Sequence, residues 1–263
     1  MKKYWFIFKT EFINELQYVG NFLVGSISLV LILYIYLNLW RYLYSDPSSL
    51  INGYSYTQMV WYVLFTETVW SCVKGRKIVA EIAQDVKTGN ITYQLNKPYS
   101  YINYMISKTV ATFSFKLLIL LPASLLLGTI LIGNIPYFNL FGCILAIITG
   151  VIGTIINILI CITLGLISFF IEDANPIYWI YSKVILVVGT LFPIEFMPKI
   201  IQPFLEYSPI FALNYGPAKL FVEFNNVFFI KVIISQAIYL VLFYILANLI
   251  YKKGVKNINV NGG

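Results

Sequence analysis

The sequence predicts an all-α integral membrane protein with six transmembrane helices, an N-terminal interfacial amphipathic helix, and short re-entrant or interfacial helices before the last span. Hydrophobic residues make up 59% of its 263 residues and charged residues only 11%. A soluble core of this size could not bury so many apolar side chains. In addition, no charged residue occurs between Lys116 and Glu172. That stretch is long enough for two bilayer crossings at roughly 20 residues each.

Hydropathy along the chain indicates where the six spans lie. They are predicted at residues 22–42, 56–73, 105–131, 140–170, 177–192 and 227–251. Pro122 lies inside the third span and predicts a kink, because proline removes a backbone donor. All of these segments form one transmembrane domain over residues 1–263.

The N-terminal segment 1–20 is amphipathic, and no cleavable signal peptide is expected. At the helical spacing of 100° per residue, Trp5, Phe8, Phe12, Leu16 and Val19 fall on one face. An aromatic face opposite a polar one is typical of a helix in the membrane interface. The alternative is that this segment extends the first span.

The positions of the basic residues predict the orientation. Three lysines precede the first span, six basic residues follow the second span in residues 74–108, and three lysines lie in residues 252–256, out of 18 in the chain. The positive-inside rule therefore places both termini in the cytoplasm of a multi-pass protein of the cell membrane. This orientation accounts for the basic net charge, so nucleic acid is not expected as a partner.

Three absences narrow the chemistry. The chain has no histidine, which excludes histidine metal sites and Ser–His catalytic triads. Cys72, Cys143 and Cys161 lie in apolar segments without a Cys-x-x-Cys spacing, so we interpret them as packing residues and expect no metal site. No phosphate-binding loop of the Gly-x-x-x-x-Gly-Lys-Ser/Thr type occurs. We therefore predict no catalytic residues.

The stretch 74–104 on the predicted inner side contains a short amphipathic helix. Ile78, Ile82 and Val86 recur at four-residue spacing, and Glu81 and Asp85 form a neighbouring stripe. A helix of this kind is suited to docking on a soluble partner. The alternative is a surface helix that only contacts lipid headgroups.

The remainder of this inner stretch is predicted to be a connection. Gly89 is placed to end the short helix in the left-handed conformation. Residues 91–95 are predicted to be extended, and a new helix is expected to begin near Ser100 after Pro98.

The outer segment 193–226 contains five of the ten prolines, separated by apolar and aromatic residues. It is too apolar for a solvated loop and too interrupted for a membrane crossing. Short re-entrant or interfacial helices protected by protein satisfy both conditions. Such a segment could close an outer gate, or it could simply pack against the spans.

Charged and small residues inside the spans suggest two kinds of helix contact. Glu67 and Lys116 lie at comparable predicted depth, and because each is costly when unpaired, we predict an ion pair between them. The alternative is that Lys116 extends towards the interface. A stripe of small residues along the fourth span allows close helix approach, within this chain or to a second copy. Its members are Gly142, Ala146, Gly150 and Thr154.

The order of these features resembles the ABC-2 type transporter permease family, the six-span membrane subunits of ABC exporters. One landmark is the inner pattern Glu81-Ile-x-x-Asp85-x-x-x-Gly89-x-Ile91-x-x-x-Leu95-x-x-Pro98-x-x-Tyr101. A second is Phe192-Pro-Ile-Glu-Phe-Met-Pro198, followed by Ser208-Pro-Ile-Phe and Gly216-Pro217. The resemblance covers essentially the whole chain.

The resemblance implies that the chain is one subunit of an ATP-driven exporter. Two such permeases, identical or different, pair in the membrane and recruit separately encoded ABC ATPase subunits. Those partners bind ATP and Mg²⁺, so no cofactor is expected in this chain. The substrate is expected to be amphipathic or hydrophobic and to cross at the interface between the permeases or enter from the membrane lipid.

The resemblance also assigns residue roles. Residues 77–87 correspond to the coupling helix that is seated in the ATPase, and residues 89–98 brace it. The coupling residues are Lys77, Glu81, Asp85, Gly89, Leu95 and Pro98. The alternative function is an ion-gradient-driven secondary transporter or channel, for which Glu67 is the one obvious carboxylate within a span.

Overall fold

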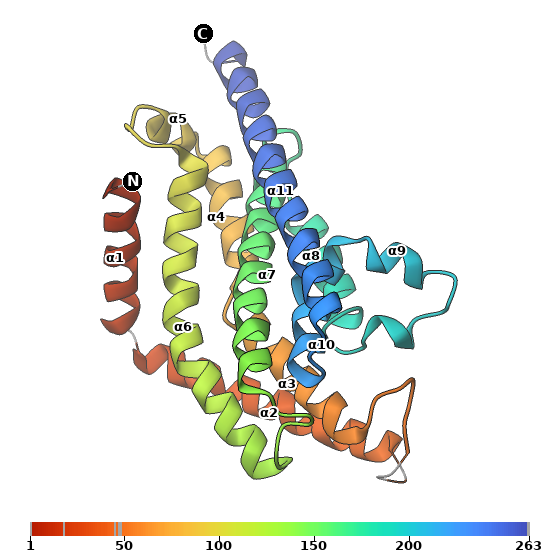
Figure 1. The fold of residues 1–263 in the computed structure, drawn as a ribbon. Coiled ribbons are helices and arrows are strands. Elements are labelled where there is room, and N and C mark those ends of the chain that lie inside the picture. Colours follow the sequence, from red (N-terminus) through yellow and green to blue (C-terminus); the bar gives the residue numbers. More distant parts are fainter. Residues whose placement is uncertain (1, 18, 45, 47–48, 262–263) are drawn as a thin grey trace.

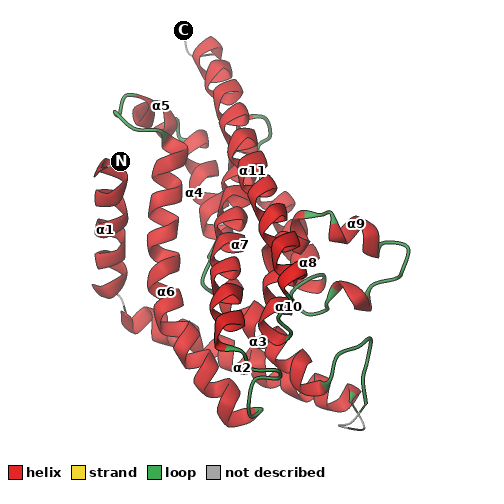
Figure 2. Ribbon diagram, in the orientation of Figure 1, coloured by secondary structure: helices red, strands yellow, loops and turns green. Residues whose placement is uncertain are grey.

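The computed structural model describes residues 2–17, 19–44, 46 and 49–261, and within these ranges the chain forms helices joined by loops (Figure 2). The helices, including short 3₁₀ and π segments labelled η, have the following bounds: α1 Lys2–Gln17, α2 Val19–Leu43, α3 Tyr56–Ser71, α4 Gly75–Lys87, α5 Asn90–Leu95, α6 Tyr101–Leu131, α7 Leu140–Leu166, η1 Ile167–Phe169, α8 Asn175–Val187, η2 Ile194–Phe196, α9 Gln202–Glu206, η3 Phe211–Tyr215, α10 Gly216–Val222 and α11 Asn226–Asn261.

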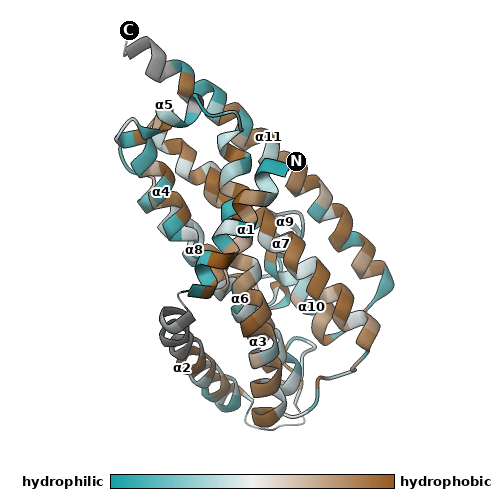
Figure 3. Ribbon diagram, turned by 90° about the vertical axis from the view of Figure 1, so that its left-hand side faces the viewer, coloured by the Kyte–Doolittle hydropathy of each residue, from teal (hydrophilic) through white to brown (hydrophobic). Residues whose placement is uncertain are grey.

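The all-α membrane fold is confirmed. Within the described residues, three helices are long and apolar enough to cross a bilayer, namely Tyr101–Leu131, Leu140–Phe169 and Asn226–Lys256. In Figure 3, hydrophobic residues dominate α3, α6 and α11, whereas hydrophilic residues gather around α4, α5 and the start of α1. The total of six spans stays a prediction.

The predicted fifth span is shorter than expected. Helix α8 has 13 residues, which at 1.5 Å per residue is about 20 Å, less than the roughly 30 Å of a bilayer core. The chain leaves the helix at Val188, which has an extended backbone, and Gly189 follows with a φ of 91°. Hydropathy detected the apolar run as far as Phe192 but not this turn.

Helix α3 lies at the centre of the bundle. It begins with a capping box, in which the Ser55 hydroxyl accepts from the Gln58 backbone and the Gln58 side chain accepts from the Ser55 backbone. Every residue from Gln58 to Val69 is buried. A helix that is buried all round belongs to the core of the protein rather than to its lipid-facing surface.

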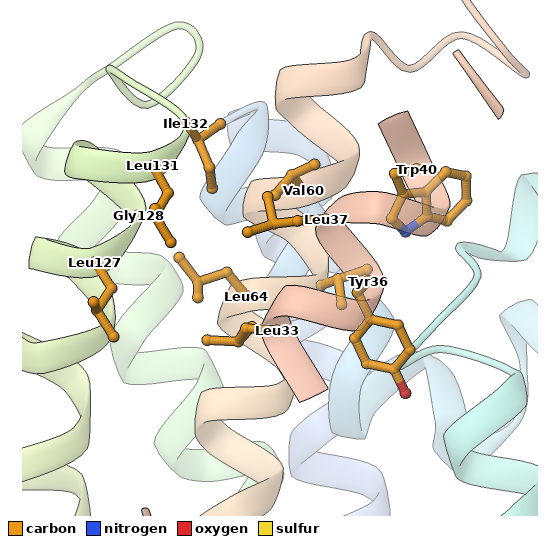
Figure 4. Close-up of a pocket in the computed structure, with 11 residues that line it drawn as sticks. Leu33, Tyr36, Leu37, Trp40, Val60, Leu64, Leu127, Gly128, Leu131 and Ile132 are labelled. Atoms are coloured by element: carbon orange, nitrogen blue, oxygen red, sulfur yellow. The ribbon is translucent and has the colours of Figure 1, made fainter. Parts of the chain in front are cut away.

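Helices α2, α3 and α6 enclose a small apolar cavity (Figure 4). Its volume is about 20 Å³, and its walls include Leu33, Leu37, Leu64 and Leu131. That space is close to the minimum for one water, and apolar cavities of this kind stay dry. The cavity is therefore a packing feature and not a ligand site.

Helix α1 runs beside the first half of α6 and in the same direction (Figure 1). The Tyr4 hydroxyl accepts from the Ser100 backbone N–H at 3.0 Å, and the Phe12 ring packs edge-on against Phe115. The predicted N-terminal helix is confirmed, and α6 covers part of its aromatic face while Trp5 stays exposed. Its position in the membrane interface stays a prediction.

Helix α6 contains Pro122, as predicted, and its ribbon bends in the second half of the helix (Figure 1). Beginning at Tyr101, the helix matches the start expected near Ser100. Helix α1 begins, and α11 ends, at the end of the molecule that carries α4 and α5 (Figure 1). This arrangement agrees with an even number of crossings, while the cytoplasmic location of that end stays a prediction.

The small-residue stripe of α7 contacts other parts of the same chain. Its four members are buried. A Cβ added at Gly142 would lie 2.7 Å from Phe224, and one added at Gly150 would lie 3.0 Å from the Phe65 ring. The stripe thus allows α3 and the segment after α10 to approach α7 closely.

The outer segment consists of short helices, as the sequence predicts. Segments η2 and α9 precede the π-helical turn η3, which continues directly into α10. All five residues of η3 are buried, and α10 packs against α3 and α7. Its packing role is therefore confirmed, whereas a gating role stays a prediction.

Candidate functional site

Helix α4 is held on the bundle by one apolar face. Ile78, Val79 and Ile82 are buried and pack against α7. A Cβ added at Gly165 of α7 would lie 2.9 Å from the Cβ of Ile82. A Cβ added at Gly75 would meet the Tyr178 hydroxyl of α8 at 2.7 Å. Glycine at these two positions thus lets α4 approach α7 and α8 closely.

The acidic stripe of α4 faces α6. The Glu81 carboxylate forms an ion pair with the Lys108 ammonium, and Asp85 accepts a hydrogen bond of 2.8 Å from the Tyr101 hydroxyl. These contacts fix the rotation of α4 about its own axis. The sequence grouped Glu81 and Asp85 with the residues that meet a partner, whereas the structure engages both side chains within the chain.

The face of α4 opposite its apolar face is open. Lys77, Ala80, Gln84 and Lys87 are exposed, and their spacing of three, four and three residues places them on one side of the helix. Among the predicted coupling residues of α4, Lys77 is the one on this open face. We call Lys77, Ala80, Gln84 and Lys87 the α4 outer face.

The connection after α4 differs from the prediction in one respect. Gly89 has a φ of 73° and ends the helix as predicted. The prediction of an extended segment at 91–95 is wrong, because these residues form α5. The reason is tertiary: Ile91 is completely buried, and its burial outweighs the extended preference of Ile-Thr-Tyr. Leu95 is the last residue of α5.

The turn from α5 to α6 is tied to the N-terminal helix. The Lys3 ammonium donates to the carbonyl of Pro98, next to the contact between Tyr4 and Ser100. Pro98 therefore contributes a backbone acceptor to this junction. Through it, the α4–α5 unit is connected to α1 as well as to α6 and α7.

The predicted ion pair between Glu67 and Lys116 is absent. The two residues are 6% and 3% exposed, and neither the Glu67 Oε1 atom nor the Lys116 ammonium has a hydrogen-bond partner among the described residues. They face different surroundings: Glu67 acts electrostatically on Tyr36 of α2, whereas Lys74 and Glu15 act on Lys116. Equal depth in two helices does not set the direction in which each side chain points.

A second polar cluster lies in the outer segment and was not predicted from the sequence. Glu195 forms an ion pair with Lys219 and accepts hydrogen bonds from Tyr215 at 2.6 Å and from Tyr54 at 3.2 Å. We call these four residues the Glu195 cluster. It joins η2 to η3, α10 and the loop before α3. A lone carboxylate in the apolar run Phe192-Pro-Ile-Glu-Phe-Met-Pro198 was the available signal.

The Tyr54 hydroxyl in this cluster stays protonated. Burial, followed by the charge of Glu195, raises the pKa of Tyr54 above its usual range. Tyr54 therefore stays a hydrogen-bond donor to the Glu195 carboxylate over the physiological pH range. The cluster is a closed set of donors around one acceptor, which suits a structural tie.

Replacing Lys219 by methionine is expected to weaken the Glu195 cluster. The substitution keeps most of the apolar stem but leaves the Glu195 carboxylate without its cation, so we expect a loss of about 1–3 kcal/mol in stability. Thermal unfolding of the detergent-purified protein measures this loss. Exchanging the more exposed Lys231 for methionine provides the control, because exposed ion pairs contribute only about 0–1 kcal/mol. Equal losses in the two variants would contradict the role of the cluster.

The apolar helical bundle, with α4 packed on its surface, defines the class of the protein as a polytopic α-helical membrane protein. Residues 29–262 match the family described as ABC-2 family transporter protein. The chain belongs to this family, which confirms the resemblance, and it is a membrane subunit of an ABC transporter that acts in transport rather than in catalysis. Membership implies association with ABC ATPase subunits. No individual curated protein matches the chain.

Proposed function

We propose that this chain is the permease of an ABC exporter and that α4 is the helix through which a separate ATPase drives it. The observation that carries the proposal is the construction of α4. One face is packed on α7, the acidic stripe is bound to α6, and the α4 outer face is left open. Such a helix can transmit a push, because its inner contacts reach two of the long spans.

The mechanism follows from these contacts. Binding of ATP and Mg²⁺ by the partner ATPases would close them and displace α4. The ion pair of Glu81 with Lys108 and the packing of Ile82 on α7 would pass that displacement to α6 and α7. The spans would then alternate between inward-open and outward-open arrangements, as in other transporters with two global states. A second permease, identical or different, would complete the path for an amphipathic or hydrophobic substrate.

The orientation that this proposal requires places α4, α5 and both ends of the chain in the cytoplasm, with the protein in the cell membrane. The basic residues around α4 and at the two ends support this assignment. The Glu195 cluster would then lie towards the outer side, and would hold the short helices of the outer segment together during the transport cycle.

The test is affinity purification of the protein from its native membrane in mild detergent, followed by mass spectrometry. We expect an ABC ATPase to co-purify. Ala80→Arg places a long charged side chain in the middle of the α4 outer face and should reduce the retained ATPase at least tenfold. Asn134→Arg introduces the same side chain at an exposed position in the turn after α6 and should retain it.

Two outcomes would reject the proposal. One is an unchanged amount of ATPase with Ala80→Arg, because the α4 outer face would then not be the docking surface. The other is transport by the purified protein under an ion gradient without any ATPase. That second result would favour a secondary transporter, for which the buried Glu67 carboxylate supplies the titratable group.

A further inference from the structure

A polar pocket opens between α1, the first half of α4 and the first half of α6. Its volume is about 60 Å³, and its charged walls are Glu15, Lys74, Lys77, Glu81 and Lys108. A space of about 10–15 Å³ is needed to hold one water. The pocket therefore has room for several waters or for one tetrahedral anion. Lys74 and Lys77 are exposed, so the pocket can be reached from the surface.

Lys116 does not line the pocket itself but lies one helical turn after Thr112 of α6, which does. Its ammonium is buried and has no hydrogen-bond partner among the described residues. The charged groups that act on it are Lys74, Lys77 and Glu15, all of which line the pocket. A buried ammonium without a partner is costly, and at this position two further cations repel it.

The charges around the pocket do not balance. The Glu81 carboxylate is neutralised by Lys108. Glu11 also acts on Lys108. Lys74, Lys77 and Lys116 then stand against Glu15 and Glu11, so one positive charge remains unmatched. No ion pair joins these three lysines to a carboxylate within the described part of the chain. An anion in the pocket would relieve their repulsion and would be stabilised by the low dielectric around Lys116.

We propose that this pocket binds the phosphate group of an anionic phospholipid of the inner leaflet. The position next to α1 favours a lipid over a free ion. Helix α1 exposes the apolar side chains Trp5, Phe6 and Leu16, against which acyl chains can lie. Lys74 and Lys77 donate to the phosphate oxygens. Lys116, one helical turn beyond the pocket wall, contributes its positive charge. The inner-leaflet assignment rests on the orientation in the proposed function. Lipid binding itself needs no ATPase and is tested at Lys74 and Lys116, which lie outside the α4 outer face, so its failure can be distinguished from a failure of the coupling role of α4.

The experiment uses the full-length protein, delipidated in detergent. Phosphatidylglycerol, phosphatidylcholine or inorganic phosphate is added at matched concentrations, and bound lipid and melting temperature are measured by native mass spectrometry and thermal unfolding. We expect phosphatidylglycerol to bind and to raise the melting temperature. Lys74→Gln should weaken this binding about tenfold, the effect of losing one charge-assisted hydrogen bond.

Two further variants complete the design. Lys116→Met should weaken phosphatidylglycerol binding similarly while leaving the lipid-free protein folded, since it removes an unpaired buried charge. Lys252→Gln removes one positive charge at the same end of the molecule, from an exposed position outside the pocket, and should bind like the original protein. Equal binding by Lys74→Gln and the original protein would overturn the proposal. An equal shift with inorganic phosphate would overturn the lipid assignment, and an equal shift with phosphatidylcholine would overturn the preference for an anionic lipid.

Discussion

Exchanging Gly165 for valine is expected to uncouple α4 from the membrane helices. The Cβ alone would lie 2.9 Å from the Cβ of Ile82, and valine adds two further methyl groups on the same side. Because Ile82 is completely buried, it cannot rotate into open space, and α4 must move away from α7. We expect ATPase retention and ATP-driven transport to fall more than tenfold.

The same variant should remain folded, because Gly165 lies at the end of α7 and the central packing of α3 is untouched. ATPase retention is measured by quantitative mass spectrometry of the purified complex, and folding by gel filtration and thermal unfolding. A second substitution, Ile82→Ala, keeps the Cβ of Ile82 but removes its Cδ1 and Cγ2 atoms, which would lie 3.1 and 3.2 Å from the added Cβ. It should restore part of the lost binding, so the two changes together should cost less than their sum. Normal ATPase retention by Gly165→Val would show that the packing of α4 against α7 is not required for coupling.

The long apolar helices could be predicted from the sequence because hydropathy depends on local composition alone. Helices α6, α7 and α11 therefore begin within a few residues of their predicted positions. The short helix α5 could not be predicted in this way. Its residues Ile91, Thr92 and Tyr93 favour an extended backbone locally, and the helix depends on the burial of Ile91.

The sites show the same division between local and distant causes. The α4 helix and its end at Gly89 follow from apolar spacing and one glycine, both of which are local. The direction in which a charged side chain points is not determined by the local sequence. Glu67 and Lys116 have comparable predicted depths but different charged neighbours. The Tyr54 partner of Glu195 lies 141 residues away in the sequence. Only the packed structure brings such residues together.

The contact between α7 and η3 brings two backbones close together and leads to the largest expected loss of stability. A Cβ at Gly153 would lie 2.4 Å from the carbonyl oxygen of Leu213 and 3.0 Å from that of Ala212. These are backbone atoms, which cannot rotate away. The Ala212 oxygen also accepts a hydrogen bond of 2.9 Å from Gln236 of α11. Any shift of η3 therefore disturbs three elements.

Gly153→Ala should lower stability by about 2–3 kcal/mol, the upper part of the range for inserting an extra methyl group into a packed core. Gly150→Ala is the matched control. It lies one helical turn away, and its added methyl group would meet the Phe65 ring edge at 3.0 Å, so a small movement of a side chain can relieve the contact. Thermal unfolding of both detergent-purified variants, followed by tryptophan fluorescence, measures the difference. If Gly153→Ala has the same melting temperature as Gly150→Ala, η3 can shift at little cost in free energy. The close approach of α7 to η3 then does not determine the stability of the outer segment.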